Sequence, residues 1–390
     1  MKLKKLENKL SPLLKYPGGK DKELIHILPN LPADAANYYE PFVGGGAVFF
    51  AVKSTHYYIN DKSDELMNLY ELIAEENVAF LNFLEQIEEN WILMSEVIDR
   101  HSSELLRIYK RFKSDEISKI QLSDEIYYFV FHNSIEFNGM LTPNFNVGIE
   151  NFVEELFKCI INKIVRMKML ENKKGEITDF DKILNIESSF KSAFYIHFRY
   201  LYNNINNFHI SKEFATAIYF YIREYCYSSM FRYNSNGGFN VPYGGISYNR
   251  KSLEKKINYF KSEELKEHLK KTTFDRLDFF DFMSKYPPKI NDFVFLDPPY
   301  DTEFSTYAQN TFAKSDQQRL AKYLIEDCNG YFMLIIKDTE FIQSLYKNGI
   351  KTKNGRILNV EKFDKKYMVS FQNRNEKNVE HLLITNYQLN

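Results

Sequence analysis

Four consecutive residues, Asp297, Pro298, Pro299 and Tyr300, carry groups that could hold an aromatic amine. Such an amine is a poor nucleophile because its lone pair is delocalised into the ring, unless acceptors hold its hydrogens. The carboxylate of Asp297 and the backbone carbonyl of Pro298 are two acceptors, and Tyr300 could stack on the ring and position it. Each residue alone has an ordinary explanation in a turn, a stiff loop or packing. Together they predict a site that positions an aromatic amine for reaction.

The residues before this motif place it at the end of a strand. Residues 293–296 form an apolar run rich in β-formers, which is typical of a buried parallel strand. Because proline cannot continue a β-ladder, the chain must leave the sheet at Asp297. The motif is therefore expected at the carboxyl end of a strand, where open α/β sheets bind ligands.

A loop with a lysine lies near the start of the chain. It contains Tyr16, Gly18, Gly19 and Lys20, and a helical pattern follows at residues 24–28. Free backbone amides and a cation at the start of a helix suit a carboxylate or phosphate, although a tight turn would have the same composition. The spacing is not that of a P-loop.

A glycine-rich turn follows within residues 38–49, which read as a strand, a turn and a helix. Glycines there let the backbone approach a ligand closely. A dinucleotide site needs a third glycine where this sequence has Phe49, which disfavours an NAD enzyme. The candidate binding residues of this turn are Glu40, Pro41, Phe42, Gly44 and Gly46.

Another acid ends the next predicted strand. Residues 57–59 are followed by Asn60 and Asp61, and a helix is predicted from about Ser63 through Tyr70. An acid at the end of a second strand could accept hydrogen bonds from ribose hydroxyls. A helix-capping role explains Asp61 equally well.

Taken in order, these motifs resemble those of DNA adenine methyltransferases of the Dam type. That family has the loop motif, the glycine motif, a target-recognition region and the catalytic tetrapeptide in the order found here. The resemblance implies that S-adenosylmethionine is the cofactor and that residues of the first two motifs surround it. It places Lys20 near the cofactor carboxylate, Asp61 at its ribose and Asp297 near the target amine. By position, Asp278 resembles the acid that meets the cofactor adenine, and Asp275 is the alternative.

A later segment, residues 223–245, resembles the DNA-contacting hairpin of the same family. It reads Arg-Tyr-Asn, a glycine turn, then Phe-Asn-Val-Pro-Tyr-Gly. Arginine and asparagine read guanine and adenine edges, and a β-ribbon fits the major groove, although an ordinary polar hairpin would look similar. The candidate DNA-binding residues are Arg232, Tyr233, Asn234, Asn240, Tyr243 and Arg250.

The distance from Asp61 to Asp297 requires an insertion, because one β-α unit takes about 30 residues. We expect a catalytic domain formed by residues 1–72 and 257–390. Residues 73–256 should form a mostly helical target-recognition domain with a β-hairpin at 232–245. Helical patterns run at about 152–170 and from Phe194 to Tyr227.

The expected fold class is α/β, a Rossmann-like methyltransferase sheet that is mostly parallel with a terminal antiparallel hairpin. The apolar stretch 331–336 predicts a further strand. Residues 367–370 and 381–385 resemble the closing hairpin of that sheet. The recognition part is expected as a largely helical insertion.

Composition limits the setting in which this chain works. The formal net charge is −1, so any nucleic acid must be held by a local basic patch. Three scattered cysteines share no metal-ligand spacing, so no metal is expected and a reducing cytoplasm is favoured. No apolar run reaches the roughly 20 residues of a membrane span.

We therefore expect site-specific methyl transfer to the N6 amine of an adenine flipped out of duplex DNA. Amino-group methylation of RNA or of a protein glutamine is one alternative, and the recognition segment argues against it. A non-catalytic DNA-binding regulator is another, and the intact tetrapeptide argues against that. A monomer is favoured, and the sequence leaves open whether a cognate restriction endonuclease exists.

Overall fold

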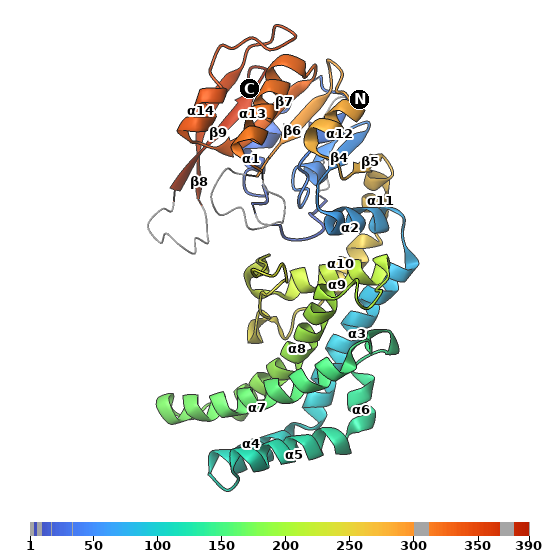
Figure 1. Ribbon diagram of the computed structural model, residues 1–390, viewed down its shortest axis with the longest axis vertical. Helices are drawn as coiled ribbons and strands as arrows, with labels where there is room; N and C mark the ends of the chain where they lie inside the picture. Colours follow the sequence, from blue (N-terminus) through green and yellow to red (C-terminus); the bar gives the residue numbers. More distant parts are fainter. Residues whose placement is uncertain are drawn as a thin grey trace. The chain divides into compact units, whose positions relative to one another are not determined.

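The chain folds into two compact units in the computed structural model (Figure 1). One unit is formed by residues 1–75 and 260–390, and the other by residues 76–259. The boundaries predicted from the sequence, 72/73 and 256/257, lie near these limits, and the roles assigned to the two parts stay predictions. The structure describes residues 4–5, 10–16, 18–32, 34–299, 312–366 and 378–389.

Seven strands form one sheet in the discontinuous unit, in the order β5-β4-β2-β6-β7-β9-β8. The first five of these run parallel, whereas β9 is antiparallel to both β7 and β8. The predicted Rossmann-like fold with a terminal antiparallel hairpin is confirmed, although residues 367–370 lie outside the described residues. The strands are β2 Tyr38–Glu40, β4 Tyr57–Asn60, β5 Thr272–Asp275, β6 Phe293–Leu296, β7 Tyr331–Lys337, β8 Asn359–Lys366 and β9 Asn378–Thr385.

Shorter elements complete this unit. A separate two-stranded sheet pairs β1 with β3. The helix predicted after Asp61 begins where expected, because the Ser63 side chain accepts a hydrogen bond from the Leu66 amide, and it continues to Ala74. These elements are β1 Lys4–Lys5, β3 Val52–Lys53, α1 Leu24–Ile27, α2 Asp64–Ala74, α11 Glu263–Leu269, α12 Phe279–Lys285, α13 Lys314–Lys322 and α14 Glu340–Leu345.

The central strand β6 is buried on both faces, as its apolar sequence predicts. On one face, Val294 and Leu296 belong to a core to which α12, α13 and α14 contribute. On the other face, Phe293 packs against Tyr38 with ring centroids 6.0 Å apart. Burial between aromatic rings lowers the pKa of His268 on that side to about 3, so this histidine is neutral in the core.

The sheet has its topological switch point at β2. This strand lies between β4 and β6, and the register pairs Tyr38 with Phe293 and Tyr39 with Val294. The carboxyl ends of β2 and β6 therefore lie side by side, and they carry Glu40 and Asp297. Ligands of open α/β sheets bind at such a point.

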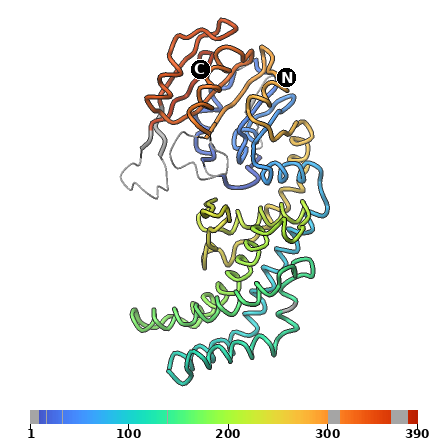
Figure 2. The backbone as a smooth tube through the Cα atoms, in the orientation of Figure 1, coloured from blue at the N-terminus to red at the C-terminus, as the bar shows by residue number. Residues whose placement is uncertain are grey.

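The second unit is built mainly of helices (Figure 2). None of the helices in the described part of the chain is long and apolar enough to cross a membrane. Its helices are α3 Val78–Arg100, α4 Ser102–Lys113, α5 Lys119–His132, α6 Ser134–Gly139, α7 Ile149–Lys174, α8 Asp179–Asn203, α9 Lys212–Tyr225 and α10 Glu254–Phe260, which leads back to the sheet unit.

The single helix predicted from Phe194 to Tyr227 is wrong. Two helices occupy this region, because α8 ends at Asn203 and α9 starts at Lys212. The Ser211 side chain accepts a hydrogen bond from the Phe214 amide at 3.2 Å and caps the new helix. The apolar periodicity continues across the break, which is why the sequence pattern does not reveal it.

A buried carboxylate ties three helices of this unit together. Glu171 of α7 accepts hydrogen bonds from the Tyr109 hydroxyl at 2.6 Å and from the Ile177 amide at 3.0 Å. Its Oε2 also lies 2.8 Å from Lys113 Nζ, and Lys182 of α8 lies 3.7 Å from its Oε1. Burial alone would raise the pKa of Glu171, but these partners outweigh burial and hold the pKa at about 2.

Glu171→Gln should destabilise the helical unit, because Lys113 and Lys182 lose their shared buried anion. The cost should be on the order of 3 kcal/mol in the free energy of unfolding, measured by denaturant titration with helical circular dichroism. Because the folded pKa is depressed, this stabilisation is present above about pH 4.5 and fades as the pH falls toward 2. Glu176→Gln is the matched control, since Glu176 bridges the same lysines while exposed to solvent. Equal losses in the two variants would contradict the assignment.

Candidate active site and nucleic-acid interface

The glycine turn after β2 is packed too tightly for side chains. Gly44 and Gly46 have φ of 47° and 73°. A Cβ on Gly46 would lie 2.4 Å from the Tyr70 hydroxyl, which itself donates to the Gly44 carbonyl at 3.1 Å. The sequence therefore needs glycine here for the path of the backbone and for the packing of Tyr70 beneath it.

Tyr16 brings the first loop motif onto this turn. A Cβ on Gly45 would lie 2.9 Å from Tyr16 Cβ, and one on Gly44 would lie 3.1 Å from the Tyr16 ring. The two motifs, separated in the sequence, are therefore in contact. Pro17, between Tyr16 and Gly18, lies outside the described residues.

Asp61 connects the end of β4 to the glycine turn. Its Oδ2 accepts from the Gly44 amide at 3.1 Å, and its Oδ1 accepts from the Ser63 amide at 3.0 Å. Burial raises the pKa of Asp61, and these two backbone hydrogen bonds oppose the rise. The predicted capping role and a ligand-facing role are compatible, because each carboxylate oxygen has a second lone pair.

Asn60, the residue before Asp61, organises the same edge. Its Nδ2 donates to the Pro41 and Leu277 carbonyls, each at 3.0 Å, while its Oδ1 accepts from the Leu277 amide at 2.8 Å. It thereby ties the turn after β2 to the turn after β5. The sequence pattern predicts only Asp61 as a site residue here.

Lys20 and Asp297 form an ion pair at the switch point. The Lys20 side chain is buried, and its Nζ also donates to the Gly18 carbonyl at 3.0 Å. The loop motif near the start of the chain thus meets the acid that follows β6. The sequence predicted Lys20 beside a cofactor carboxylate and did not foresee this pairing.

Glu40 is a second buried acid near this pair. It accepts a hydrogen bond from the Tyr38 hydroxyl at 2.7 Å. Burial raises the pKa of Glu40 well above its usual range, and the negative charge of Asp297 adds to the rise, although the Tyr38 bond opposes it. The positive charge of Lys20 also opposes the rise, so Glu40 is coupled to both members of the ion pair.

The segment Asp297 to Pro299 is held from the side by α13. Pro298 is buried and Pro299 is exposed. Gln317, which is fully buried, donates from Nε2 to the Pro299 carbonyl at 3.0 Å. Its Oε1 has no partner among the described residues. Tyr300 lies outside the described residues, so its predicted stacking role stays a prediction.

An aromatic cluster with a capped acid lies along the same unit. The rings of Phe42 and Phe279 have centroids 5.6 Å apart, and Phe312 lies 5.5 Å from Phe42. Asp278 caps α12 by accepting from the Phe280 amide at 3.0 Å. Phe279 follows Asp278 directly, so the motif expected at the cofactor adenine does meet the glycine motif through Phe42.

Two cations set the charge state of Asp278. Lys62 lies 2.9 Å and Arg319 lies 2.8 Å from its carboxylate oxygens. Burial would raise the pKa of Asp278, but these cations and the capping amide lower it overall. Arg319 also lies over the Phe279 ring, 4.8 Å from its centroid. The alternative acid, Asp275, ends β5 and pairs with Lys285 at 2.7 Å.

The predicted DNA-contacting segment forms a turn closed by isolated bridges. Tyr233 bridges Phe239, and Cys226 bridges Tyr243. Within the turn, Asn234 Oδ1 accepts from the amides of residues 236 and 238. The segment therefore has the reversal expected of a hairpin, but the continuous paired strands predicted at 232–245 do not form.

The six candidate residues of this interface differ in exposure. Arg232 and Arg250 are exposed, and Asn240 is half-buried with its Oδ1 3.2 Å from Arg232 Nε. Tyr243 is buried, and its hydroxyl donates to Asn249 at 3.1 Å. The expectation of a direct contact through Tyr243 is therefore corrected, because this ring is part of the core of its unit.

Helix α8 holds the second arm of this segment by its backbone. Asn203 Nδ2 donates to the Phe239 carbonyl at 3.0 Å, and its Oδ1 accepts from the Phe239 amide at 2.8 Å. Arg199 and Tyr195, one and two turns earlier on the same helix face, both donate to the Val241 carbonyl. Asn240 lies between Phe239 and Val241, so the alternation of an extended chain puts its side chain on the side away from α8.

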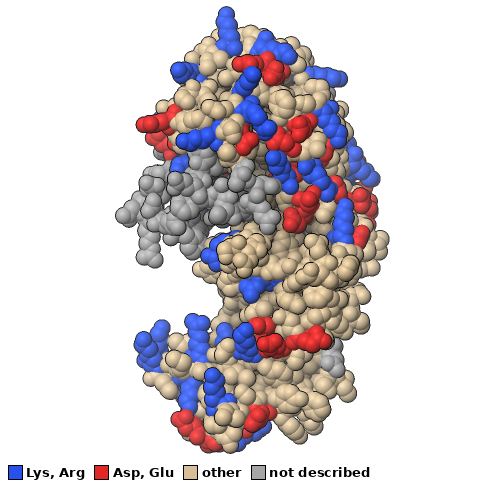
Figure 3. Space-filling model, in the orientation of Figure 1, with Lys and Arg blue, Asp and Glu red and all other residues tan. Residues whose placement is uncertain are grey.

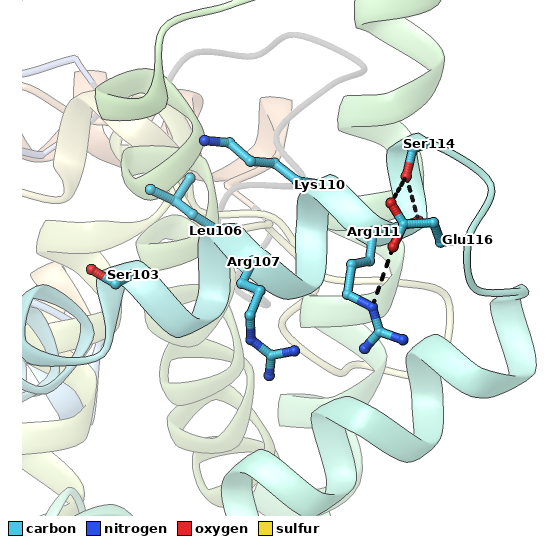
Figure 4. Close-up of a pocket in the computed structure, with 7 residues that line it drawn as sticks. All are labelled: Ser103, Leu106, Arg107, Lys110, Arg111, Ser114 and Glu116. Carbon is cyan, nitrogen blue, oxygen red and sulfur yellow. Dashed lines mark hydrogen bonds and ion pairs between the residues drawn. The ribbon is translucent and has the colours of Figure 1, made fainter.

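A surface hollow of the helical unit is a different feature (Figure 4). It has a volume of about 540 Å³ and lies along α4. Arg111, one of its two arginines, pairs with Glu116 and Glu125. Its lining residues are Ser103, Leu106, Arg107, Lys110, Arg111, Ser114 and Glu116.

The sheet order, the switch point and the acid after β6 define a Rossmann-like methyltransferase. Comparison with known families agrees, because residues 16–148 and 148–365 match the D12 class N6 adenine-specific DNA methyltransferase family. The chain belongs to this family. The predicted resemblance, fold class and enzyme class are thus confirmed.

Individual relatives cover different shares of the chain. The Type II methyltransferase M.CviBI of Paramecium bursaria Chlorella virus NC1A is 36% identical over 43% of this chain and 60% of its own length. The Retron Ec67 DNA adenine methylase of Escherichia coli is 25% identical over 87% of this chain and 81% of its own. The Type II methyltransferase M.MjaIII of Methanocaldococcus jannaschii is 23% identical over 97% and 99%.

Gln317→Leu should lower kcat for methyl transfer by roughly 10- to 100-fold, because the catalytic loop loses the donor that fixes the Pro299 carbonyl. The KM for DNA should stay close to that of the wild type. Gln317→Glu gives a sharper test, since a carboxylate cannot donate whereas a protonated carboxyl can. Its kcat relative to wild type should therefore recover as the pH falls.

Gln318→Leu is the matched control, because Gln318 is exposed on the same turn of α13. It should leave kcat unchanged. A kcat ratio of Gln317→Glu to wild type that stays flat with pH would show that Gln317 does not position the loop.

Proposed function

We propose that this chain transfers a methyl group from S-adenosylmethionine to the N6 amine of an adenine flipped out of duplex DNA. The observation that carries the proposal is the Lys20–Asp297 ion pair, which joins the first loop motif to the acid after β6. It puts a carboxylate at the sheet's switch point, beside the glycine turn. Membership in the adenine-specific family supports the same reaction.

The residues around the glycine turn fit this cofactor. Asp61 can accept from ribose hydroxyls with the lone pairs that the Gly44 and Ser63 amides leave. The rings of Phe42, Phe279 and Phe312 offer an apolar edge for its adenine. When bound, the cofactor supplies a methyl group activated by a sulfonium. The full set proposed to hold it is Tyr16, Gly18, Gly19, Lys20, Glu40, Pro41, Phe42, Gly44, Gly46, Asp61 and Asp278.

Under this proposal Lys20 contributes both to binding the cofactor and to positioning the target amine. Its ammonium holds Asp297 and the Gly18 carbonyl, and its positive charge can attract a cofactor carboxylate. By fixing Asp297 it orients the acceptor toward the target. The raised pKa of Glu40 favours its neutral form beside this pair.

The catalytic residues proposed are Asp297, Pro298, Pro299 and Tyr300. The Asp297 carboxylate and the Pro298 carbonyl accept the two hydrogens of the adenine amine, which directs its lone pair toward the methyl group. The amine gains positive charge as it is methylated, and the Asp297 carboxylate offsets that charge. Gln317 keeps the Pro299 peptide in place meanwhile.

Recognition is proposed for the turn held by α8. Arg232 and Asn240 present a guanidinium and an amide, which are the groups that read guanine and adenine edges in the major groove. Tyr233, Asn234 and Arg250 complete the proposed contact surface, and Tyr243 supports it from within. Several relatives are named Type II methyltransferases, so a cognate restriction endonuclease belongs to the proposal as a partner.

Asp297→Ala should lower methyl transfer by at least about 100-fold while the protein still retains DNA, because one of the two amine acceptors is gone. Transfer would be measured with labelled cofactor and DNA retention by mobility shift. Asp297→Asn keeps an oxygen for Lys20 and controls for the fold. Wild-type turnover in the alanine variant would remove the proposed acceptor role.

Arg232→Ala should relax the choice of methylated sequence or weaken DNA binding, by about 1–3 kcal/mol if the guanidinium reads a base edge. The readout is the set of methyladenine positions in a plasmid, mapped by sequencing. Asn236→Ala, an exposed change at the tip of the same turn, should leave the pattern intact. An unchanged pattern and affinity in Arg232→Ala would refute the assignment of this segment.

A further inference from the structure

The charges along α7 change sign between its two ends. From Ile149 to Glu155 the helix carries three acids and no cation, whereas residues 156–174 carry six cations and one acid. That one acid, Glu171, is the buried carboxylate already neutralised by lysines. Figure 3 shows Lys and Arg side chains gathered over the end of the helical unit where α7 and α4 run, with Asp and Glu beside them. The exposed charge of this half of α7 is therefore positive.

Two of the six cations have acidic partners and four do not. Lys158 pairs with Glu155 at 2.8 Å, and Lys168 pairs with Asp115 at 2.5 Å. The other four have no acid within ion-pair distance among the described residues of the helical unit. We call these four the basic stripe: Lys163, Arg166, Lys173 and Lys174.

The spacing of the basic stripe puts its members on one side of the helix. Residues three, seven and eleven positions apart share a helical face, and the stripe spans about 17 Å at 1.5 Å per residue. Lys173 and Lys174 lie in the last turn, where the helix dipole alone favours cations. Lys163 and Arg166 lie in the middle of the helix, where the dipole offers no such explanation.

Lys163 and Arg166 repel each other in the free protein. They are three residues apart on α7, and like charges at this spacing destabilise a helix. Burial lowers the pKa of Lys163, and the nearby charge of Arg166 lowers it further. An anion lying against this face would remove the repulsion, which none of the described residues does.

Helix α4 shows that this arrangement is not general in the unit. It also carries four cations, and every one of them has an acidic partner. Arg107 pairs with Glu104, and Lys110 pairs with Asp179. The remaining pairs are Arg111 with Glu116 and Glu125, and Lys113 with Glu171 and Glu176.

We propose that the basic stripe of α7 binds the phosphate backbone of duplex DNA outside the recognised sequence. The inference rests on the proposed function, in which the helical unit contacts DNA. A chain with net charge −1 needs such a local patch to hold a polyanion. At 3.4 Å of helix axis per phosphate on one strand, a 17 Å stripe faces about five phosphates. Contacts of this kind add affinity and fix orientation without reading sequence.

The test is the salt dependence of DNA binding by the full chain. A labelled duplex carrying the methylated sequence at its centre would be titrated at several salt concentrations. The double variant Lys163→Met, Arg166→Gln removes two charges and keeps most of each apolar stem. The slope of log affinity against log salt should become shallower by about 1.8, because each lost phosphate contact contributes about 0.9.

The matched control is Arg107→Gln, Lys110→Met on α4, where both cations are exposed but paired with acids. It should leave the slope at the wild-type value. Both double variants should methylate the same sequence as the wild type. The α7 double variant should have a Tm equal to or higher than that of the wild type, because the repulsion between Lys163 and Arg166 is removed. A loss of DNA binding in this variant would therefore not come from a loss of folding.

An α7 variant with the wild-type slope would overturn the proposal, and so would an equal change of slope in the α4 control. These outcomes are distinct from failure of the proposed function itself, in which the wild type would not retain duplex DNA or methylate it. They are also distinct from failure of the turn at Arg232, which is read from the methylated sequence and not from salt.

Discussion

The ion pair between Lys20 and Asp297 is the contact on which the site depends. It joins a loop at one end of the chain to the end of the central strand, across 277 positions of sequence. Because Lys20 is buried, separating it from Asp297 would leave a cation without its anion in the interior, which is costly. Burial and the charge of Asp297 raise the pKa of Glu40, which disfavours a second negative charge beside the same lysine. The positions of the glycine turn, the tetrapeptide and α13 therefore depend on one another.

The sequence was sufficient for those parts of the site that rest on backbone constraints. Proline after Asp297 can only end a strand, and Gly46 is required by the Tyr70 hydroxyl beneath it. The local structure at such residues can be predicted from residue type alone. The apolar run before Asp297 is likewise typical of a buried parallel strand. The order of the motifs gave the family resemblance, and the matched family confirms that resemblance.

Other parts of the site depend on contacts between distant segments, and no local pattern announces them. Gln317 is one of two adjacent glutamines, and only burial distinguishes it from Gln318. Arg319 reads as an exposed helical cation, although it pairs with Asp278 and covers Phe279. Asn203 is the last residue of α8, but the apolar pattern continues past it and hides the helix end. Its two hydrogen bonds to Phe239 could therefore not be predicted from the sequence. The burial of Tyr243 could not be predicted, because tyrosine occurs both in protein cores and at interfaces.

The way residues 76–259 interrupt the sheet unit has a consequence for biosynthesis. A ribosome releases β2 and β4 early, but β6, the neighbour of β2 on its other side, emerges only after the whole helical unit. The helical unit is continuous in sequence and can fold while it is being made, since domains tend to fold as they emerge. During that interval the backbone N–H and C=O groups along the β6 edge of β2 lack their ladder partners. Translation speed through the helical unit therefore sets how long an unfinished sheet edge stays open to mispairing, or to capture by a chaperone.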